Sequence, residues 1–250
     1  MGSPTSAVVH STAVLGERVE LGEGVSIGPF AVVLGPARVG DRASIGAGAK
    51  IGAPPEMSSL EQRRGWAGDD GYAGVEIGED VVIRENVVIH QGSHRATTVG
   101  SGSWILNSAY LAHDVVVGER ATISAGVSIG GHAEVGSRVN IGMNAAVHQR
   151  RVIGAGAMIG MGTPITGDVP PFAKVYGSPP RLHGVNRYVL DRLGLSASAI
   201  DALERAYALD PDRIRDVLDL EVWLAHRHLL EAWCERLDSL RPVRPEAAGA

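Results

Sequence analysis

A six-residue periodicity runs through most of this chain and limits its fold more than any other feature. Every sixth residue from Val9 to Ile51 is valine, isoleucine or leucine; the spacing resumes at Ile77 and, after a four-residue slip, runs from Val99 to Ile165. Twenty-three hexads therefore begin with a branched aliphatic leader. Six is neither a helical nor a heptad period. A hexapeptide repeat predicts a parallel β-helix, in which three hexads close one triangular coil of about eighteen residues.

Composition agrees with a narrow, frequently turning repeat. Of 250 residues, 44% are hydrophobic, which is enough for a sizeable core, but there are 33 glycines against four tryptophans, five tyrosines and two phenylalanines. Large rings would not fit a slim prism, whereas small residues suit its tight corners. We therefore expect a mainly β protein whose coils bury their faces against one another.

The hexads end in a Pro-rich crossing, DVPPF and GSPPR, after which helical patterns begin. We predict a β-helix over residues 1–186 and a small helical domain over 187–250. Ser198-x-x-Asp201 fits a capping box, and Pro211 follows Asp210 as the first residue of the next helix. Apolar residues over 217–237 have helical spacing.

Two interruptions break the repeat. Residues 57–76 form a long loop with Trp66, Asp69, Asp70 and Tyr72, and residues 95–98 make the smaller slip. Long loops in compact repeats are commonly functional, although an insertion at a coil corner is also tolerated.

Charge and cysteine content argue against several classes of protein. The net charge of −5 argues against a nucleic-acid binder. The single cysteine, Cys234, excludes an internal disulfide framework and multi-cysteine metal sites. No signal-peptide pattern and no apolar run of about 18 residues is found, so we expect no membrane span and a cytoplasmic location.

Four histidines stand out in the middle of the repeat, where glycine elsewhere follows many leaders. His113 and His132 are nineteen residues apart, and His148 follows sixteen later, close to one coil each; His90 precedes them. We expect the last three near one corner of consecutive coils. Such a column could be solvated turn residues, could bind zinc, or could perform acid–base catalysis. Asp114 beside His113 favours catalysis, because a carboxylate can fix an imidazole's tautomer and stabilise its protonated form.

The segments IGPFAV, IRENVVIHQGS, AHD, GGH, AAVHQ, DVPPF and GVN, in this order, resemble the UDP-N-acetylglucosamine 3-O-acyltransferase family. The resemblance covers nearly the whole chain. It implies a left-handed parallel β-helix, a homotrimer with each active site between two subunits, acyl carrier protein as the donor's carrier, and a sugar nucleotide as acceptor. The resemblance further implies that His113 is the general base, that Asp114 orients this base, and that Gly131 donates a backbone N–H to the oxyanion. His132 and His148 line the substrate cleft.

The resemblance also assigns residues to specificity. Asn186 and Arg192 match positions that hold the nucleotide, and Met161 matches the position that closes the acyl pocket. Tyr110 replaces a family histidine, Glu56 at best replaces an aspartate, and Tyr188 replaces a glutamate. The thioester is already activated, so we expect neither a metal nor another cofactor. The γ-carbonic anhydrases share the fold, but their zinc-binding His-x4-His pair is not found here.

Two other functions are consistent with the sequence. One is an acyltransferase of the same fold that uses another acceptor, such as an amino sugar or a natural-product intermediate, or takes its acyl group from coenzyme A. The other is a non-catalytic β-helix scaffold. Arg150 and Arg151 could dock the acidic acyl carrier protein, or they could be solvated corner residues.

Overall fold

The structure is a computed structural model that describes residues 6–60 and 72–245. Of the predicted long loop, Trp66, Asp69 and Asp70 lie outside the described residues. No helix in the part of the chain that the structure describes is long and apolar enough to cross a membrane.

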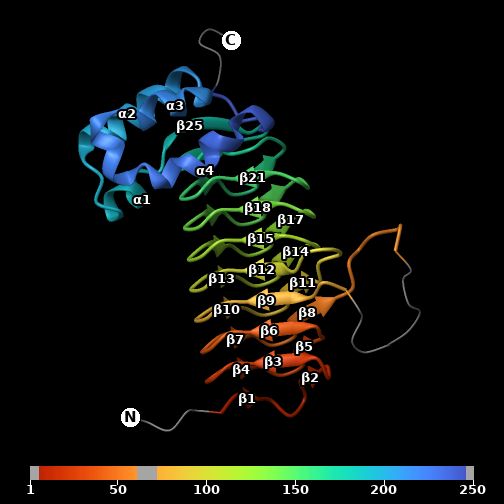
Figure 1. The fold of residues 1–250 in the computed structure, drawn as a ribbon. Helices are drawn as coiled ribbons and strands as arrows, with labels where there is room; N and C mark the ends of the chain where they lie inside the picture. The colour runs from red at the N-terminus through yellow and green to blue at the C-terminus, as the bar shows by residue number, and fades with distance from the viewer. Residues whose placement is uncertain (1–5, 61–71, 246–250) are drawn as a thin grey trace, which may run out of the picture.

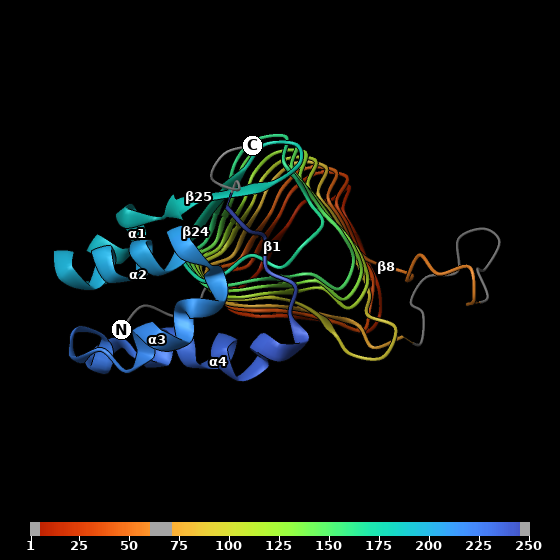
Figure 2. The ribbon, with the colours of Figure 1, turned by 90° about the horizontal axis from the view of Figure 1, so that it is seen from above.

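Short parallel strands form three sheets that make the faces of a triangular prism (Figures 1 and 2). Sheet A has ten strands: Val8–Val9 (β1), Ser26–Ile27 (β4), Ser44–Ile45 (β7), Val82–Ile83 (β10), Trp104–Ile105 (β13), Thr122–Ile123 (β16), Asn140–Ile141 (β19), Met158–Ile159 (β22), Ala173–Tyr176 (β24) and Arg181–Val185 (β25). Sheet B has eight: Val14–Leu15 (β2), Val32–Val33 (β5), Lys50–Ala53 (β8), Val88–His90 (β11), Tyr110–Leu111 (β14), Ser128–Ile129 (β17), Ala146–Val147 (β20) and Pro164–Ile165 (β23). Sheet C has seven: Val19–Leu21 (β3), Ala37–Val39 (β6), Val75–Ile77 (β9), Thr97–Val99 (β12), Val116–Val117 (β15), Glu134–Val135 (β18) and Val152–Ile153 (β21).

The predicted repeat matches these strands one for one, since each strand from β1 to β23 contains one aliphatic leader. Val8 pairs with Ser26, one coil of eighteen residues later, and this spacing recurs wherever the hexads are unbroken. Every leader from Ile27 to Ile165 is at most 3% exposed. Burying each of these side chains contributes roughly 1.5–3 kcal/mol, which explains why a two-residue strand can be stable here.

Corners between the sheets require left-handed backbone at the second turn position. Among the described residues, twelve that are not glycine adopt it with φ from 54° to 62°, including Arg42, Asp114, His132 and Arg150. L-residues adopt this conformation uncommonly, so the repeat itself, through its stacked coils, stabilises it. Corner side chains are therefore positioned by the backbone.

The C-terminal end covers the prism. Strand β25 pairs antiparallel with β24 and closes sheet A. The helical segments that follow are Arg187–Arg192 (α1), Ala197–Leu209 (α2), Pro211–Arg213 (η1), Ile214–Leu218 (α3), Glu221–His226 (η2), His228–Arg236 (α4) and Leu237–Ser239 (η3). Helices α1 and α2 lie beside sheet A, and α4 lies along sheet C (Figure 2). The Tyr207 hydroxyl of α2 donates to the carbonyl of Pro171, which ties the helices to the last coil.

Two helical predictions were wrong in detail. The N-cap of α2 is Ser196, whose side chain accepts from the N–H of Ala199, so Ser198 lies inside the helix. The helical spacing over 217–237 does not correspond to one continuous helix, because the chain is interrupted at Leu220, where the backbone is extended. The Trp223 indole N–H donates to the carbonyl of Ala199, so packing against α2 overrides the local helical pattern. Pro211 does stand at the first turn of its helical segment, as predicted.

Candidate active site

His113 and Asp114 form a close pair at the corner between sheets B and C. His113 Nδ1 lies 2.7 Å from a carboxylate oxygen of Asp114, and the Asp114 side chain has no exposed surface. Adjacent residues on a strand point to opposite faces, but the left-handed backbone of Asp114 turns the two side chains toward each other. The predicted orienting contact is present in the structure.

A tight loop between β11 and β12 encloses the Asp114 carboxylate. The backbone N–H groups of Ser93, His94 and Arg95 donate to it over 3.0 to 3.2 Å, and the Ser93 hydroxyl donates over 2.7 Å. The backbone N–H of Asp114 donates to the Thr97 hydroxyl. Successive main-chain N–H groups make a fixed nest for a negative charge.

These contacts decide the charge of Asp114 and the tautomer of His113. Burial by itself raises the pKa of Asp114, but the hydrogen bonds from His113, Ser93 and Arg95 outweigh it and hold the pKa well below its usual range. An ionised carboxylate only accepts hydrogen bonds, so Nδ1 of His113 carries the proton. Nε2 is then left with a lone pair that can accept a proton.

Gly131 lies directly against the reactive edge of His113. A Cβ built on Gly131 would lie 2.7 Å from Cε1 and 2.8 Å from Nε2 of the His113 ring. Such an approach is too close for a real Cβ, so only glycine at this position leaves the His113 ring where it is. The backbone of residue 131 therefore stands next to the atom that would take the proton.

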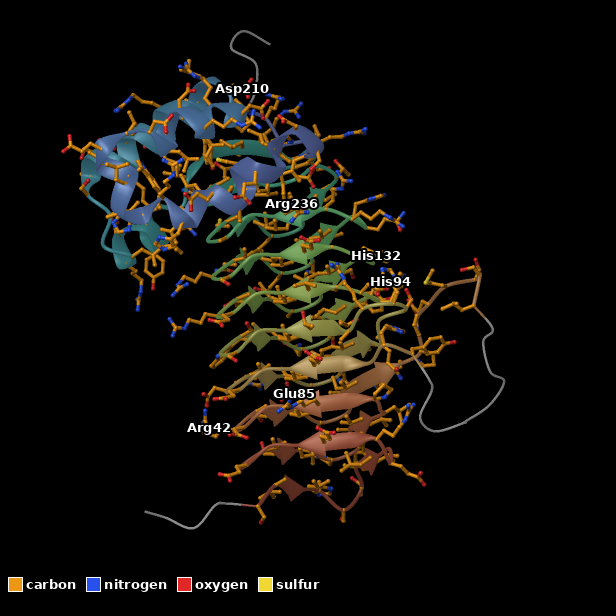
Figure 3. All side chains as sticks on the ribbon, viewed as in Figure 1. Arg42, Glu85, His94, His132, Asp210 and Arg236 are labelled. Atoms are coloured by element: carbon orange, nitrogen blue, oxygen red, sulfur yellow. The ribbon has the colours of Figure 1, made fainter. Side chains whose placement is uncertain are left out.

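Three imidazoles gather around Asp114. The ring of His132 lies edge-on to His113, with centroids 5.0 Å apart, and stacks with His94 at 5.1 Å. Figure 3 shows His94 and His132 side by side at the edge of the β-helix. Burial lowers the pKa of His132 and the charges of His113, Arg150 and His94 lower it further, against an opposing effect of Asp114. His132 therefore favours its neutral form.

His94, Asp114 and His132 have ligand atoms within 4.8 Å of one another, a spacing that could hold a metal ion. The carboxylate of Asp114, however, already accepts hydrogen bonds on both oxygens from the enclosing loop and from His113. A metal would have to displace these donors, so the donor set fits a metal poorly.

A second polar group lies on sheet B, where Tyr110 of β14 contacts His90 of the neighbouring strand β11. The Tyr110 hydroxyl donates to the Glu56 carboxylate, and the His90 ring packs edge-on against Tyr110. His90 Nδ1 lies 2.6 Å from the carbonyl oxygen of Pro54, and its Nε2 lies 3.6 Å from Glu56. Burial and the bond to Glu56 raise the pKa of the Tyr110 hydroxyl, so Tyr110 stays neutral.

The predicted nucleotide residues lie elsewhere, in a cleft of about 520 Å³ between sheet A and α1. Arg192 donates to the Tyr188 hydroxyl and lies 5.4 Å from the centre of that ring. Asn186 also lines this cleft, but its side-chain amide donates to the carbonyl of Gly156 and fixes the start of α1. In a single chain, this cleft and the His113 corner are on different corners of the prism.

Two further predicted residues are apart from the pair. Met161 is 68% exposed at the corner between sheets A and B. His148 is exposed, and strand pairing aligns it with Ala112, not with His113. Its Nδ1 lies 3.1 Å from the carbonyl oxygen of Gln149. The three histidines of the expected column therefore lie at the same corner of consecutive coils but do not occupy equivalent positions in their coils.

Sequence reasoning missed the residues that hold Asp114, namely Ser93, His94, Arg95 and Thr97. Their only signal was the four-residue slip in the repeat between Ile89 and Val99. The slip marked extra chain at this corner, but it did not indicate where that chain would fold.

Comparisons with known proteins agree with this architecture. The bacterial transferase hexapeptide (six repeats) model matches residues 18–53 and 96–131, and a model described as UDP N-acetylglucosamine O-acyltransferase, domain 2, matches residues 168–209. The crystal structure of UDP-N-acetylglucosamine O-acyltransferase from Moraxella catarrhalis superimposes with a TM-score of 0.76 at 25% identity, over 94% of this chain and 99% of that one.

Curated relatives carry the same name. The acyl-[acyl-carrier-protein]–UDP-N-acetylglucosamine O-acyltransferase of Paracidovorax citrulli is 38% identical over 63% of this chain and 55% of its own length. That of Syntrophobacter fumaroxidans is 44% identical over 52% of this chain and 54% of its own length. The chain thus spans about half the length of the curated relatives it matches.

The fold and the repeat define a left-handed hexapeptide-repeat protein, which confirms the predicted left-handed β-helix with C-terminal helices. Within that class, the chain is similar in sequence and in fold to UDP-N-acetylglucosamine O-acyltransferases.

Proposed function

We propose that this protein transfers an acyl group from acyl carrier protein to the 3-hydroxyl of UDP-N-acetylglucosamine or a closely related sugar nucleotide. The observation that carries the proposal is the His113–Asp114 pair, whose unprotonated Nε2 lies against the Gly131 backbone. The names of the relatives supply the substrate classes.

His113 acts as the general base. Its Nε2 takes the proton of the sugar hydroxyl while that oxygen attacks the thioester carbon, and a tetrahedral intermediate forms. When the carbon–sulfur bond breaks, the imidazolium returns the proton to the leaving thiolate. Asp114 stabilises the imidazolium between these steps, and a positioned base of this kind contributes about 10²–10⁴ in rate.

The negative oxygen of the intermediate is bound by the backbone N–H of Gly131. This donor is next to the base, and one oxyanion donor contributes roughly 2.7–4 kcal/mol to transition-state stabilisation. His132 and His148 line the substrate cleft, and His132 in its neutral form can donate or accept a hydrogen bond there. The thioester is already activated, so the reaction as proposed uses no metal or other cofactor.

A different acceptor is the second candidate, and the Tyr110–Glu56 contact favours it. These two side chains bond to each other on the strand that leads to the base, so an acceptor that reaches this strand would meet a neutral phenol and a carboxylate. A carboxylate could pair with the ammonium group of an amino sugar. Acyl-coenzyme A is the corresponding alternative for the donor.

The proposal includes the assembly and its partners. The active chain is a homotrimer in the cytoplasm, each site lies between two subunits, and Asn186 and Arg192 of the cleft beside α1 hold the nucleotide. Arg150 is one coil beyond His132 on the same corner and would dock the acidic acyl carrier protein, whereas the guanidinium of Arg151 is turned toward the Asp168 carboxylate, 3.4 Å away. Exposed Met161 closes the acyl pocket and shortens the accepted chain.

Mass spectrometry of products tests the proposal. The protein is incubated with UDP-N-acetylglucosamine and a panel of acyl-carrier-protein thioesters of increasing length, with the same acyl-coenzyme A series in parallel. We expect one ester-linked acyl group per sugar nucleotide, from short chains for the natural protein and longer ones for Met161→Gly. Absence of product with this acceptor, but transfer to an amino sugar, would favour the second candidate. No transfer to either acceptor would refute both.

A further inference from the structure

Arg95 contacts both ends of Asp114. Its backbone N–H donates to the Asp114 carboxylate over 3.1 Å, while its guanidinium donates to the Asp114 carbonyl oxygen from Nε over 3.0 Å and from a terminal nitrogen over 2.8 Å. One residue therefore fixes the side chain and the main chain of the carboxylate that orients His113.

A line of charged side chains continues from Arg95 to the helical domain. Glu134, on β18, lies 3.6 Å from the Arg95 guanidinium through one oxygen and accepts a hydrogen bond of 2.6 Å from Arg236 through the other. Arg236 is the last residue of α4. In Figure 3 it lies at the edge of the helical domain that faces the β-helix. Helix α4 is thus connected to the corner that carries the pair.

The side chain of Asp114 needs such support. The coil already holds the corner backbone of Asp114 at a φ of 61°, but the carboxylate must also keep its position to hold the His113 ring. A guanidinium offers several donors in a fixed plane, so it can bond the Asp114 carbonyl twice and still face Glu134. A lysine ammonium has no comparable fork.

We propose that Arg95 is a positioning residue for the Asp114–His113 pair, and that Glu134 and Arg236 hold Arg95 in place, so that the helical domain supports catalytic geometry. The inference rests on the proposed function. Arg95 touches no reacting atom in this scheme, and its effect passes entirely through Asp114.

A double-mutant cycle tests this directly. We expect Arg95→Met to lower kcat about 10- to 100-fold with KM within about twofold, because a small displacement of the base is costly to the chemical step. In an Asp114→Ala background the same substitution should change kcat by less than about twofold, since its target is gone. Arg95→Lys should restore little, and Glu134→Gln should show a smaller loss than Arg95→Met.

Arg42→Met is the matched control, because Arg42 also forms ion pairs with the acidic side chains of a neighbouring coil but lies far from the His113–Asp114 pair. Circular dichroism and thermal melting confirm folding of each variant. If Arg95→Met does not fold, Arg95→Lys and Glu134→Gln replace it in the cycle. An unchanged kcat, or an undiminished effect of Arg95→Met in the Asp114→Ala background, would overturn the inference.

A second readout does not need turnover. The ring N–H proton that His113 shares with Asp114 should give a downfield resonance, assigned by its loss in His113→Ala. We expect Arg95→Met to broaden or remove it and Arg42→Met to leave it intact. If the wild-type protein transfers no acyl group, the proposed function fails while this signal still tests the positioning role. A resonance unchanged by Arg95→Met would refute that role.

Discussion

The Asp114 corner and the Arg42 corner have the same backbone but use charge in opposite ways. Their φ values are 61° and 58°. The Arg42 side chain is 55% exposed and pairs with Glu79 and Asp80 of the neighbouring coil over 3.0 and 2.8 Å. The Asp114 carboxylate is fully buried and is bound largely by main-chain N–H groups.

The difference lies in the chain beside each corner. The coil requires a left-handed residue at this position. At Arg42 the charge of the side chain is solvated by water and paired with exposed carboxylates. At Asp114 the repeat slips, and the extra residues fold back as a loop that replaces water around the charge. Fixed dipoles in a buried site stabilise a charge without reorganising, whereas exposed ion pairs are weakened by solvent and salt. The repeat supplies the geometry, and the slip supplies the site.

The largest effect should come from removing the pair itself. His113→Ala deletes the base, so we expect kcat to fall by about 10²–10⁴ with the fold unchanged. Acyl transfer is measured by product mass spectrometry. His10→Ala, an exposed histidine on the first coil, is the matched control and should keep full activity. A His113→Ala protein within a few fold of wild type would remove the base from the mechanism and favour a scaffold.

Gly131→Ala should come next, with a loss of about 10- to 100-fold in kcat and little change in melting temperature. The added Cβ meets the His113 ring, which can rotate away and so spare the fold but not the chemistry. Gly102→Ala is the converse control. Its φ of 68° makes any side chain strained, so the melting temperature should fall by an amount that corresponds to about 1 kcal/mol while activity stays. Equal activities in the two variants would contradict the close approach to His113.

The β-helix could be predicted from the sequence because its determinants are local and repeated. Each leader adds the same evidence, and twenty-three of them agree on one period. The helical end was harder, because the break at Leu220 depends on how Trp223 packs against α2, a contact that no local pattern records. Tertiary contacts decided the exact limits of those helices.

The site divides in the same way. That His113, Asp114 and Gly131 lie close together could be predicted because they are adjacent in sequence or one coil apart, while their roles stay predictions. The loop donors Ser93 and Arg95 could not be predicted, since about twenty residues separate them from Asp114 and any residue except proline can contribute a backbone N–H. For Asn186, the family role predicted from the motif stays a prediction, while the structure gives its amide a local use at the start of α1.

Acid unfolding should separate the two kinds of corner. The pKa of Asp114 is lowered in the folded state, so its charge stabilises the fold above the ordinary value near 3.8 and that contribution is lost as pH falls through the folded pKa. We therefore expect the melting temperature of Asp114→Asn to lie below that of the wild type at pH 6. The gap between the two melting temperatures should become smaller as pH falls below about 4. Asp80→Asn, whose carboxylate also has a lowered pKa but is exposed, should show a much smaller gap. A gap for Asp114→Asn that stays constant down to pH 2.5 would contradict the buried, charged carboxylate.

The smallest effect is expected at the Arg42 corner. Arg42→Met removes both ion pairs, but each partner is more than half exposed, and such pairs contribute little because water already solvates the separated charges. We expect unchanged acyl transfer and, at most, a slight fall in melting temperature that disappears in 1 M salt, where exposed charges are screened. Melting curves at low and high salt provide the measurement. A large, salt-resistant destabilisation would mean that the Arg42 corner also depends on its charges for stability. The two corners would then differ only in that Asp114 contributes to catalysis.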